Sequence, residues 1–443
     1  MDKYEKAKLG DLCQIIKGET GIASAEPGQY PLVTTGAERK TAKTFQFDAE
    51  AVCIPLVSST GHGKKSLNYV HYQKGKFALG TILTAVIPHD SRKVSAAFLH
   101  RYLQFYKDRK IVPFMKGAAN VSLAIKDIAR IEIPVPPIEK QIAFIDLFNR
   151  TNGFNIELLS EFMDQSGFLS RLRQAILQEA IEGKLTADWR KKNPVRKGDP
   201  DTDAVALLEK IKTEKQKLIA EGKRKEKSIE NTITYRDNGL PGSWIYCKGD
   251  EILFVTKLAG FEYTKYIELK KQGEIPVVRA QNVKQLVLDK TNLLFIDVKT
   301  SKILERSALT KKALLVTFIG AGIGDVAFFN ERTRWHLAPN VAKMEPILEE
   351  SLDLRYLNYF LLAKAGQREI FKHIKATAQP SLSMGTIRDI DYTLPPLAEQ
   401  RAIVERVDRL LTMVDELEKQ VIERKGQAEE LMQAVLREAF EGK

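Results

Sequence analysis

A 69-residue segment of this chain occurs twice, once in the middle and once at the C-terminus, without a gap. Residues 116–184 and 375–443 align at a constant offset of 259 and are identical at 23 positions. The alignment places Pro136-Pro137 on Pro395-Pro396. A period this long excludes a solenoid of short repeats and indicates one large module used twice. We therefore expect a protein that binds its partner at two related places.

The segments that precede each copy are predicted to be globular domains. Each has short β-rich runs separated by glycine-rich turns, followed by one helical stretch. Residues 1–137 carry the strand candidates Tyr30–Val33, Ala51–Ile54 and Ile82–Ile87 and a helix over 96–109. Residues 241–396 repeat the plan with Ile275–Val278, Ala313–Val316 and a helix near 352–364. The pattern predicts two mixed α/β domains within an α+β fold class.

The repeated segments themselves are predicted to be long helices. After each Pro-Pro pair, residues 138–184 and 397–443 contain no proline and are rich in strong helix formers. At ~1.5 Å per residue, a continuous helix of this kind would form a rod of about 69 Å. Gly167 and Gly426 occupy matching positions, and we expect them to mark a shared bend.

Apolar residues in the second helix fall at spacings of 3, 4, 3 and 4 residues, which is the pattern of a coiled-coil seam. The seam residues are Val407, Leu410, Val414, Leu417 and Val421, and their equivalents in the first copy are Phe148, Thr151, Asn155, Leu158 and Phe162. We expect the two helices to pack as an antiparallel coiled coil with one globular domain at each end.

Residues 185–240 form a linker with no counterpart after the second copy. The linker contains a charged helical stretch from Asp203 to about Lys227, and it has 14 Lys and Arg residues against 10 Asp and Glu residues. Because the two signs are nearly balanced, we expect a solvated helix rather than a nucleic-acid-binding tail.

The composition is that of a basic globular protein, with 44% apolar residues, 28% charged residues and a formal net charge of +12. An excess of this size suggests a polyanionic partner such as nucleic acid, although a lysine-rich surface would give the same number. The three cysteines are scattered and form no CxxC pair. No apolar run approaches the ~18 residues of a membrane helix, and the charged N-terminus lacks a signal-peptide core. The sequence therefore predicts a cytoplasmic protein without membrane contact.

Several strings resemble catalytic motifs but lack a required residue. Gly61–Ser66 ends like a phosphate-binding loop, but Ser58 stands where a Walker motif needs glycine. Gly320–Asp325 has Asp325 where a dinucleotide-binding fingerprint needs its third glycine. The six histidines show no metal-ligand spacing, and no cluster suggests a nucleophile or an acid–base pair. We predict a non-catalytic chain without a metal site.

Four strings together carry a family resemblance. Ile133–Gln141 leads into the first long helix, and Glu182–Arg190 (EGKLTADWR) ends it. Leu240–Trp244 (LPGSW) opens the second domain, and Leu394–Gln400 (LPPLAEQ) leads into the second helix. This order resembles the specificity subunit of type I restriction–modification enzymes over essentially the whole chain. The first half departs from the pattern, since it lacks the Leu-Pro-x-x-Trp opening and has Lys140 where Glu is usual.

The resemblance implies a division of labour. The domains 1–137 and 241–396 would be target-recognition domains in a pseudo-twofold arrangement, each reading one half of a split, asymmetric site in double-stranded DNA. The conserved helices, residues 138–184 and 397–443, would set the spacing and dock two copies of a methyltransferase subunit. Motor–nuclease subunits would join them. S-adenosylmethionine, ATP and Mg would bind those partner subunits, with no cofactor on this chain. A rod of about 69 Å would cover about two DNA turns.

Sequence-specific reading requires polar and basic side chains on loops that enter the major groove. The candidates in the first domain are Thr34, Thr35, Arg39, Lys40, Lys43, Ser59, His62, Lys64, Lys65, Lys116 and Asn120. The candidates in the second domain are Arg279, Gln281, Asn282, Lys284, Arg332, Arg334, Lys375 and Gln379. The candidates for contact with other subunits are Gln141, Gln400, Val407, Leu410, Val414, Leu417, Val421, Phe148, Leu158 and Phe162. For Gln141 and Gln400, a role as helix caps is the alternative.

Two other classes of function remain open at this stage. The chain could be a non-enzymatic coiled-coil scaffold whose paired domains bind protein or carbohydrate, or an enzyme with two active sites. Steep salt dependence of binding to duplex DNA would count against the scaffold. We also expect that truncation after Pro396 removes methyltransferase binding and leaves both domains folded.

Overall fold

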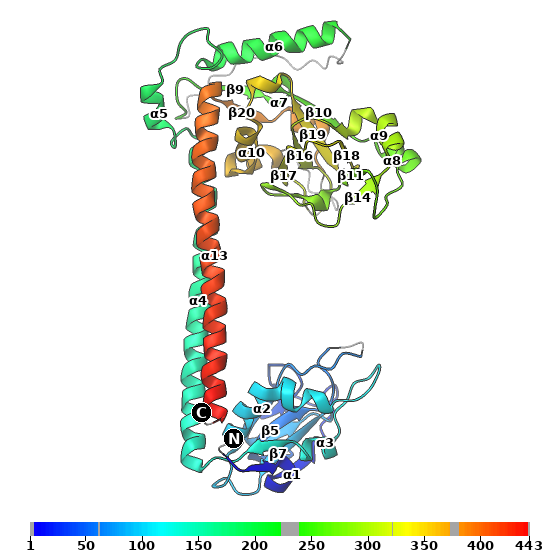
Figure 1. Cartoon of the computed structure of the whole chain (residues 1–443). Coiled ribbons are helices and arrows are strands. Elements are labelled where there is room, and N and C mark those ends of the chain that lie inside the picture. Colours follow the sequence, from blue (N-terminus) through cyan, green and yellow to red (C-terminus); the bar gives the residue numbers. More distant parts are fainter. Residues whose placement is uncertain (1–3, 61–62, 223–238, 321, 373–380, 442–443) are drawn as a thin grey trace. The chain divides into compact units, whose positions relative to one another are not determined.

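The computed structural model describes residues 4–60, 63–222, 239–320, 322–372 and 381–441 (Figure 1). The chain forms two compact units. The first comprises Met1–Asp164 with Val421–Lys443, and the second comprises Gln165–Gln420. Each unit contains one globular domain and a part of both long helices.

The domain of the first unit is built on a six-stranded sheet in the order β2-β7-β5-β6-β3-β4. Its strands are β2 (Cys13–Lys17), β3 (Tyr30–Val33), β4 (Lys40–Ala42), β5 (Phe47–Pro55), β6 (His71–Leu79) and β7 (Leu83–Pro88). All neighbours are antiparallel except β3 and β6, which run parallel. The remaining elements are β1 (Lys6–Lys8), which pairs with β8 (Glu132–Pro134), and the helices α1 (Leu9–Leu12), α2 (Ala96–Lys110), η1 (Val112–Phe114) and α3 (Ile125–Ala129).

Both faces of this sheet are covered, which explains the continuous apolar run in β5. Val52 and Ile54 pack with Phe98 of α2 on one face. Ala51 and Cys53 belong to a separate apolar cluster on the other face. Successive strand residues point to opposite faces, so a strand buried on both sides needs apolar residues at every position.

The second domain repeats this plan with two strands divided. Its sheets have the orders β10-β19-β16-β17 and β14-β11-β18-β15. The strands β15 and β16 together occupy the place of β5, and β17 and β18 occupy the place of β6, because β18 pairs parallel with β11 as β6 does with β3. The strands are β10 (Leu253–Lys257), β11 (Ile275–Val278), β14 (Leu294–Ile296), β15 (Ala308–Leu309), β16 (Ala313–Thr317), β17 (Val326–Phe329), β18 (Trp335–Leu337) and β19 (Val341–Pro346).

Shorter elements complete the second domain. β9 (Ile245–Lys248) pairs with β20 (Asp391–Leu394), as β1 does with β8 in the first domain, and β12 (Val283–Lys284) forms a hairpin with β13 (Val287–Leu288). The helices are α7 (Gly249–Ile252), α8 (Gly260–Tyr266), η2 (Ala280–Asn282), α9 (Val298–Ile303), η3 (Glu305–Ser307), η4 (Glu349–Ser351), α10 (Leu354–Leu362), α11 (Lys364–Phe371) and α12 (Met384–Arg388). The strand and helix candidates of both domains, and the α/β mixture that they predicted, are confirmed.

The two repeated segments form the long helices α4 (Ile138–Ile181) and α13 (Leu397–Glu441), as predicted. They lie antiparallel within each unit (Figure 1). Phe440, near the end of α13, meets Phe144, near the start of α4. Both helices run without interruption through Gly167 and Gly426.

The predicted seam is correct only in part. Val407 and Val414 are buried in the core of the second unit and Phe162 is buried as well, which excludes these three from contact with another subunit. Phe148, Leu158, Leu410 and Val421 are half-buried. Leu417 is 45% exposed, so its place in an intrachain seam was wrong. The spacing of 3 and 4 residues continues along α13 beyond Val414, which is the last residue of this helix in the core of the second unit.

The linker helix α6 (Ala204–Ala220) is not a free solvated helix, contrary to expectation. It ends before Lys227, and residues 223–238 lie outside the described residues. Leu208 and Ile211 on one of its faces are buried in the core of the second unit. Lys212 and Lys215 form ion pairs with Glu251 and Asp250 of α7. The balance of charges in the linker predicted the polar face of α6, but it gave no sign of the apolar face that packs on the second unit.

Candidate nucleic-acid interface

In the first domain, the predicted DNA-binding loop after β5 lies beside the predicted loop that contains Lys116 and Asn120. The loop after β5 contains Ser58, whose backbone N–H donates to the carbonyl of Val121 at 3.0 Å. A bridge between Val57 and Ser122 continues the contact. At Gly63 (φ 74°) a Cβ atom would lie 2.2 Å from the carbonyl oxygen of Ala118, so only glycine permits this approach. The candidates of both loops therefore belong to one surface.

The loop after β3 is fixed to the start of β6 by Arg39. Its Nε donates to Oε1 of Gln73 at 3.1 Å, and its Nη2 donates to the carbonyl of Tyr72 at 3.2 Å. Nη1 donates to Nδ1 of His71 at 3.2 Å. Arg39 therefore holds its own loop in place.

The segment before β6 joins these loops. The backbone N–H of Asn68 donates to Oγ of Ser59 at 2.9 Å. Tyr69 stacks on His71, with ring centroids 5.9 Å apart. Burial, reinforced by Arg39 and His100, lowers the pKa of His71 to about 4, and burial likewise lowers the pKa of His100 to about 4. Both rings are neutral near pH 7. The loop after β3, the loop after β5 and the loop with Lys116 and Asn120 thus form one continuous edge of the domain. The sequence could identify these loops only separately.

Most of the first domain's DNA-binding candidates are available on the surface. Thr35 is half-buried, and the exposed ones are Arg39, Lys40, Lys43, Ser59, Lys64, Lys65, Lys116 and Asn120. Lys43 pairs with Glu26 and Lys116 with Asp127. Thr34 is only 6% exposed because it directly follows the buried end of β3, so its assignment as a DNA contact was wrong. His62 lies outside the described residues.

In the second domain, the loop after β11 is also stabilised from within. Asn282 is buried, its Oδ1 accepts from the backbone N–H of Arg279 at 3.1 Å, and its Nδ2 donates to the carbonyl of Asp289 at 3.0 Å. Its assignment as a DNA contact was therefore wrong. Arg279 donates from Nη2 to the carbonyl of Asn292 at 2.5 Å. Gln281 and Lys284 remain exposed.

The other basic candidates of the second domain differ in availability. Arg332 is exposed. Arg334 donates from Nε to Oγ of Ser301 at 2.8 Å and pairs with Glu305 at 2.5 Å, so its guanidinium is engaged within the domain. Lys375 and Gln379 lie outside the described residues.

The repeated glutamine of each Pro-Pro-x-x-x-Gln string fastens a domain to its long helix. Oε1 of Gln141 accepts from the backbone N–H of Ser95, the N-cap of α2, at 2.9 Å. Oε1 of Gln400 accepts from the N–H of Asp353, the N-cap of α10, at 2.9 Å. Each amide nitrogen donates to a carbonyl of the preceding proline pair. Both side chains are fully buried, so their assignment to a subunit interface was wrong.

A second buried group explains the other repeated strings. Glu399 is 1% exposed and accepts from Oγ1 of Thr186 at 2.7 Å and from Nε1 of Trp244 at 2.8 Å. Arg190 forms an ion pair with the same carboxylate. Glu399 therefore joins three parts of the chain, namely the start of the linker, the opening of the second domain and the start of α13. In the first copy, exposed Lys140 replaces this glutamate, and that half also lacks the matching tryptophan.

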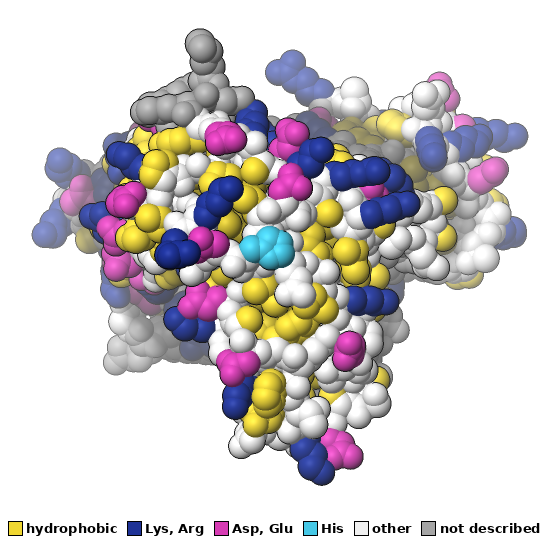
Figure 2. Space-filling model, turned by 90° about the horizontal axis from the view of Figure 1, so that it is seen from below, with side chains coloured by type: hydrophobic (Ala, Val, Ile, Leu, Met, Phe, Trp, Pro, Cys, Tyr) yellow, Lys and Arg dark blue, Asp and Glu magenta, His cyan; other side chains and the backbone are white. Residues whose placement is uncertain are grey.

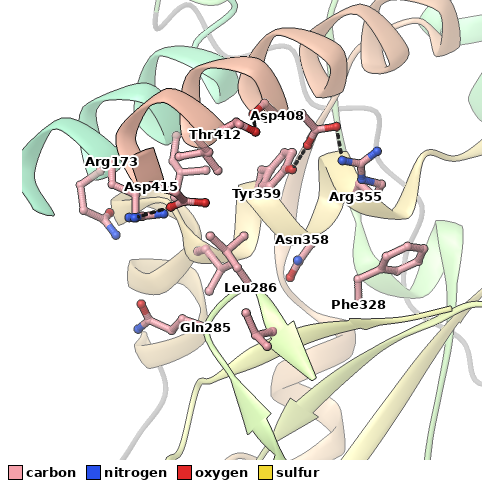
Figure 3. Close-up of a pocket in the computed structure, with 15 residues that line it drawn as sticks. Arg173, Gln285, Leu286, Phe328, Arg355, Asn358, Tyr359, Asp408, Thr412 and Asp415 are labelled. Atoms are coloured by element: carbon pink, nitrogen blue, oxygen red, sulfur yellow. Dashed lines mark hydrogen bonds and ion pairs between the residues drawn. The ribbon is translucent and has the colours of Figure 1, made fainter. Parts of the chain in front are cut away.

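A hollow of about 750 Å³ lies in the second unit beside α4, α10 and α13 (Figure 3). Arg173 of α4 points toward Asp415 of α13, and their ion pair measures 2.7 Å. Arg355 and Tyr359 of α10 both turn toward Asp408 of α13. These ion pairs and hydrogen bonds, which border the hollow, connect α13 with α4 and with α10 of the globular domain.

The long helices also expose large apolar side chains, most of them outside the predicted seam. The exposed ones are Ile142, Phe154, Ile156, Met163, Phe168, Leu172, Met413, Leu417, Ile422, Leu431 and Val435. Exposed apolar surface on this scale is typical of protein interaction sites. A search for apolar positions lying between the seam residues could have found them.

Basic side chains are not gathered into one patch on the face that Figure 2 shows. Lysine and arginine lie there among acidic and apolar side chains. The loops described above therefore define the candidate interface better than net charge does. Within the described residues, no group of three or more histidine, cysteine, aspartate or glutamate side chains could hold a metal ion. No described helix combines the length and apolar character needed to cross a bilayer.

Comparison with known proteins gives one consistent family. The family model described as type I restriction modification DNA specificity domain matches residues 1–160 and 251–424. The type I restriction enzyme EcoBI specificity subunit of Escherichia coli is 24% identical over 70% of this chain and 58% of its own length. The EcoDI specificity subunit of Escherichia coli is 22% identical over 99% of this chain and 88% of its own length.

A solved structure shares the fold. It comes from work described as the structural basis of complex assembly and conformational transition of the type I restriction–modification system. It covers 99% of this chain and 97% of its own chain, with a TM-score of 0.56 and 14% sequence identity. At this identity the likeness concerns the fold.

Proposed function

Because the chain belongs to the type I restriction–modification DNA specificity family, we propose that it is the DNA sequence-recognition subunit of such a system. Each globular domain reads one half of a bipartite, asymmetric site in double-stranded DNA. The observation that carries this proposal is the repetition of the same domain plan, with polar and basic loops at corresponding strand ends. A scaffold that binds protein or carbohydrate has no comparable support from the family.

The exposed loop residues give the proposal its chemistry. Lys64, Lys65 and Lys284 are exposed cations that suit phosphate contacts, and Gln281 and Asn120 are exposed amides that suit base edges. Arg39 and Arg279 donate side-chain hydrogen bonds within the loops that carry such groups.

Salt dependence tests DNA binding directly. The affinity of the chain, in complex with its methyltransferase subunit, should fall steeply and linearly on a logarithmic plot as salt rises, because neutralised phosphates release counterions. The double variant Lys64→Ala, Lys65→Ala should reduce the magnitude of that slope by about two, because two phosphate contacts are lost. A flat salt dependence in the unaltered complex would contradict a DNA-binding role.

We infer that the long helices carry the contacts with other subunits. The exposed apolar side chains of α4 and α13 supply surface for docking two methyltransferase subunits, and motor–nuclease subunits then join. Methylation with S-adenosylmethionine, and DNA cleavage driven by ATP and Mg, belong to those partners. This chain is then a non-catalytic member of the complex, working on DNA in the cytoplasm.

A further inference from the structure

Tyr69 occupies a position that no sequence argument singled out. Its side chain is 42% exposed at the edge where the three candidate loops of the first domain meet. The ring stacks on His71 at an interplanar angle of 28°. Its neighbour Asn68 is hydrogen-bonded to Ser59 in the loop after β5. An exposed aromatic ring is thus held in a fixed place among polar loops.

The support beneath Tyr69 is rigid. His71 is only 5% exposed, and its Nδ1 accepts a hydrogen bond from Arg39. Because arginine always donates, the ring must carry its proton on Nε2 and stay neutral. Arg39 uses all three guanidinium nitrogens on His71, Gln73, Tyr72 and the carbonyl of Ala37. A guanidinium so occupied is suited to orienting its neighbours rather than to binding a phosphate.

The surroundings of Tyr69 favour a polyanion. Lys64 and Lys65 lie in the loop tied to Asn68, and Lys40 follows Arg39. All three are exposed, and none forms an ion pair with another residue that the structure describes. The phenol offers an apolar ring face and a hydroxyl that can donate and accept. These are the groups needed to contact a thymine methyl or a base edge in the major groove.

On the basis of the proposed function, we propose that Tyr69 is a base-contacting residue of the first domain and that Arg39 is its positioning residue. Tyr69 then determines part of the sequence preference of one half-site. Arg39 acts through His71 and Gln73, without touching DNA itself.

The first test replaces Tyr69 in the full complex with the methyltransferase subunit. The probe is a duplex that carries the site methylated by the unaltered complex. Tyr69→Ala should weaken binding about tenfold and make positions in one half-site degenerate, with the other half-site unchanged. Phe45→Ala is the matched control, because Phe45 is 41% exposed but packs on Tyr30 at the opposite end of β3. An unchanged motif with unaltered affinity for Tyr69→Ala would overturn the proposal.

The second test separates positioning from phosphate contact. Arg39→Ala should reproduce the effect of Tyr69→Ala, and the double variant should lose little more, because both changes remove one unit. The salt slope should stay unchanged in Arg39→Ala, whereas loss of a phosphate contact would reduce it by about one. Additive losses with a shallower slope would refute the positioning role. If the unaltered complex methylates no bipartite site, the proposed function fails, which is a different result from a site insensitive to Tyr69.

Discussion

At the residue scale, single side chains explain the strings that the chain repeats. Gln141 and Gln400 share two kinds of partner, an N-cap N–H and a proline carbonyl, in two otherwise diverged halves. The sequence could reveal that these positions recur. It could not reveal that they face inward, because glutamine is equally suited to caps, interfaces and DNA. Only the burial of each amide decides between these roles.

Replacing either glutamine should destabilise the unit that contains it. Gln400→Ala leaves buried backbone groups without partners, which costs about 1–3 kcal/mol. Chemical unfolding of the full chain should show this loss in the transition of the second unit, and Gln141→Ala should show it in the first. Gln427→Ala, on an exposed stretch of α13, is the control. Unaltered unfolding of Gln400→Ala would mean that this fastening is not needed.

His71, which is buried, and His100, which is half-buried, make the first unit sensitive to acid. Burial lowers the pKa of His71 and of His100 to about 4, below the unfolded value of about 6.5. The unfolded chain therefore binds protons first, and stability is lost as the pH falls from about 6.5 toward 4. At pH 5 the loss is about 2 kcal/mol for each histidine.

Unfolding curves at pH 7.5 and pH 5 check this dependence. His100→Gln should remove about half of the difference in unfolding free energy between the two pH values, and His89→Gln, at an exposed site, is the control for the substitution itself. A first-unit transition that is equally stable at both pH values would contradict neutral histidine rings in the folded unit.

At the element scale, the periodic patterns predicted the strands and the long helices well. They did not predict where each element docks. The amphipathic character of α6 was hidden by its many charges, and its apolar face contacts residues far away in the sequence. The division of one strand pair into four shorter strands in the second domain likewise depends on tertiary pairing.

Because one face of α6 is buried, a substitution on that face should strongly destabilise the second unit, even though the linker is highly charged. Leu208 is 1% exposed, so Leu208→Ala should cost about 2–4 kcal/mol in the second unit. Lys210→Ala on the exposed face should be nearly neutral. Denaturant unfolding and the rate of proteolysis within the linker would measure both. Equal behaviour of the two variants would restore the solvated-helix interpretation.

The helix α13 belongs to the cores of both units, which corrects the expectation for truncation after Pro396. Phe440 packs with Phe98 and Tyr102 in the first unit, and Val407 lies in the core of the second. Removing the helix would expose both cores, so loss of methyltransferase binding after truncation would not identify a docking surface.

Surface variants test docking more cleanly. Ile156 and Met163 lie seven residues apart on α4 and are 63% and 76% exposed. Changing both to aspartate should abolish co-purification with the methyltransferase subunit without altering unfolding of the chain. Phe261→Asp, at a 73% exposed apolar site on α8, should leave the complex intact. A full yield of complex with the double variant would locate docking elsewhere.

At the scale of the whole molecule, the duplicated module is the main clue to function, and it was visible in the sequence. The family resemblance that the repeated strings carried is confirmed by the match over both halves. Individual DNA contacts were harder to predict, because exposure depends on how each loop folds back on its strand. Thr34 and Asn282 were misjudged for this reason, and Tyr69 was missed because aromatic residues are usually buried.

The most direct test of the central claim is single-molecule methylation sequencing of DNA from cells that express this chain with its methyltransferase subunit. A split, asymmetric motif should appear and should vanish when this chain is omitted. Lys64→Ala with Lys65→Ala should weaken methylation at sites with a suboptimal first half, and Gln281→Ala should relax only the other half. A motif that persists without the chain, or relaxes in both halves with Gln281→Ala, would contradict two independent reading domains.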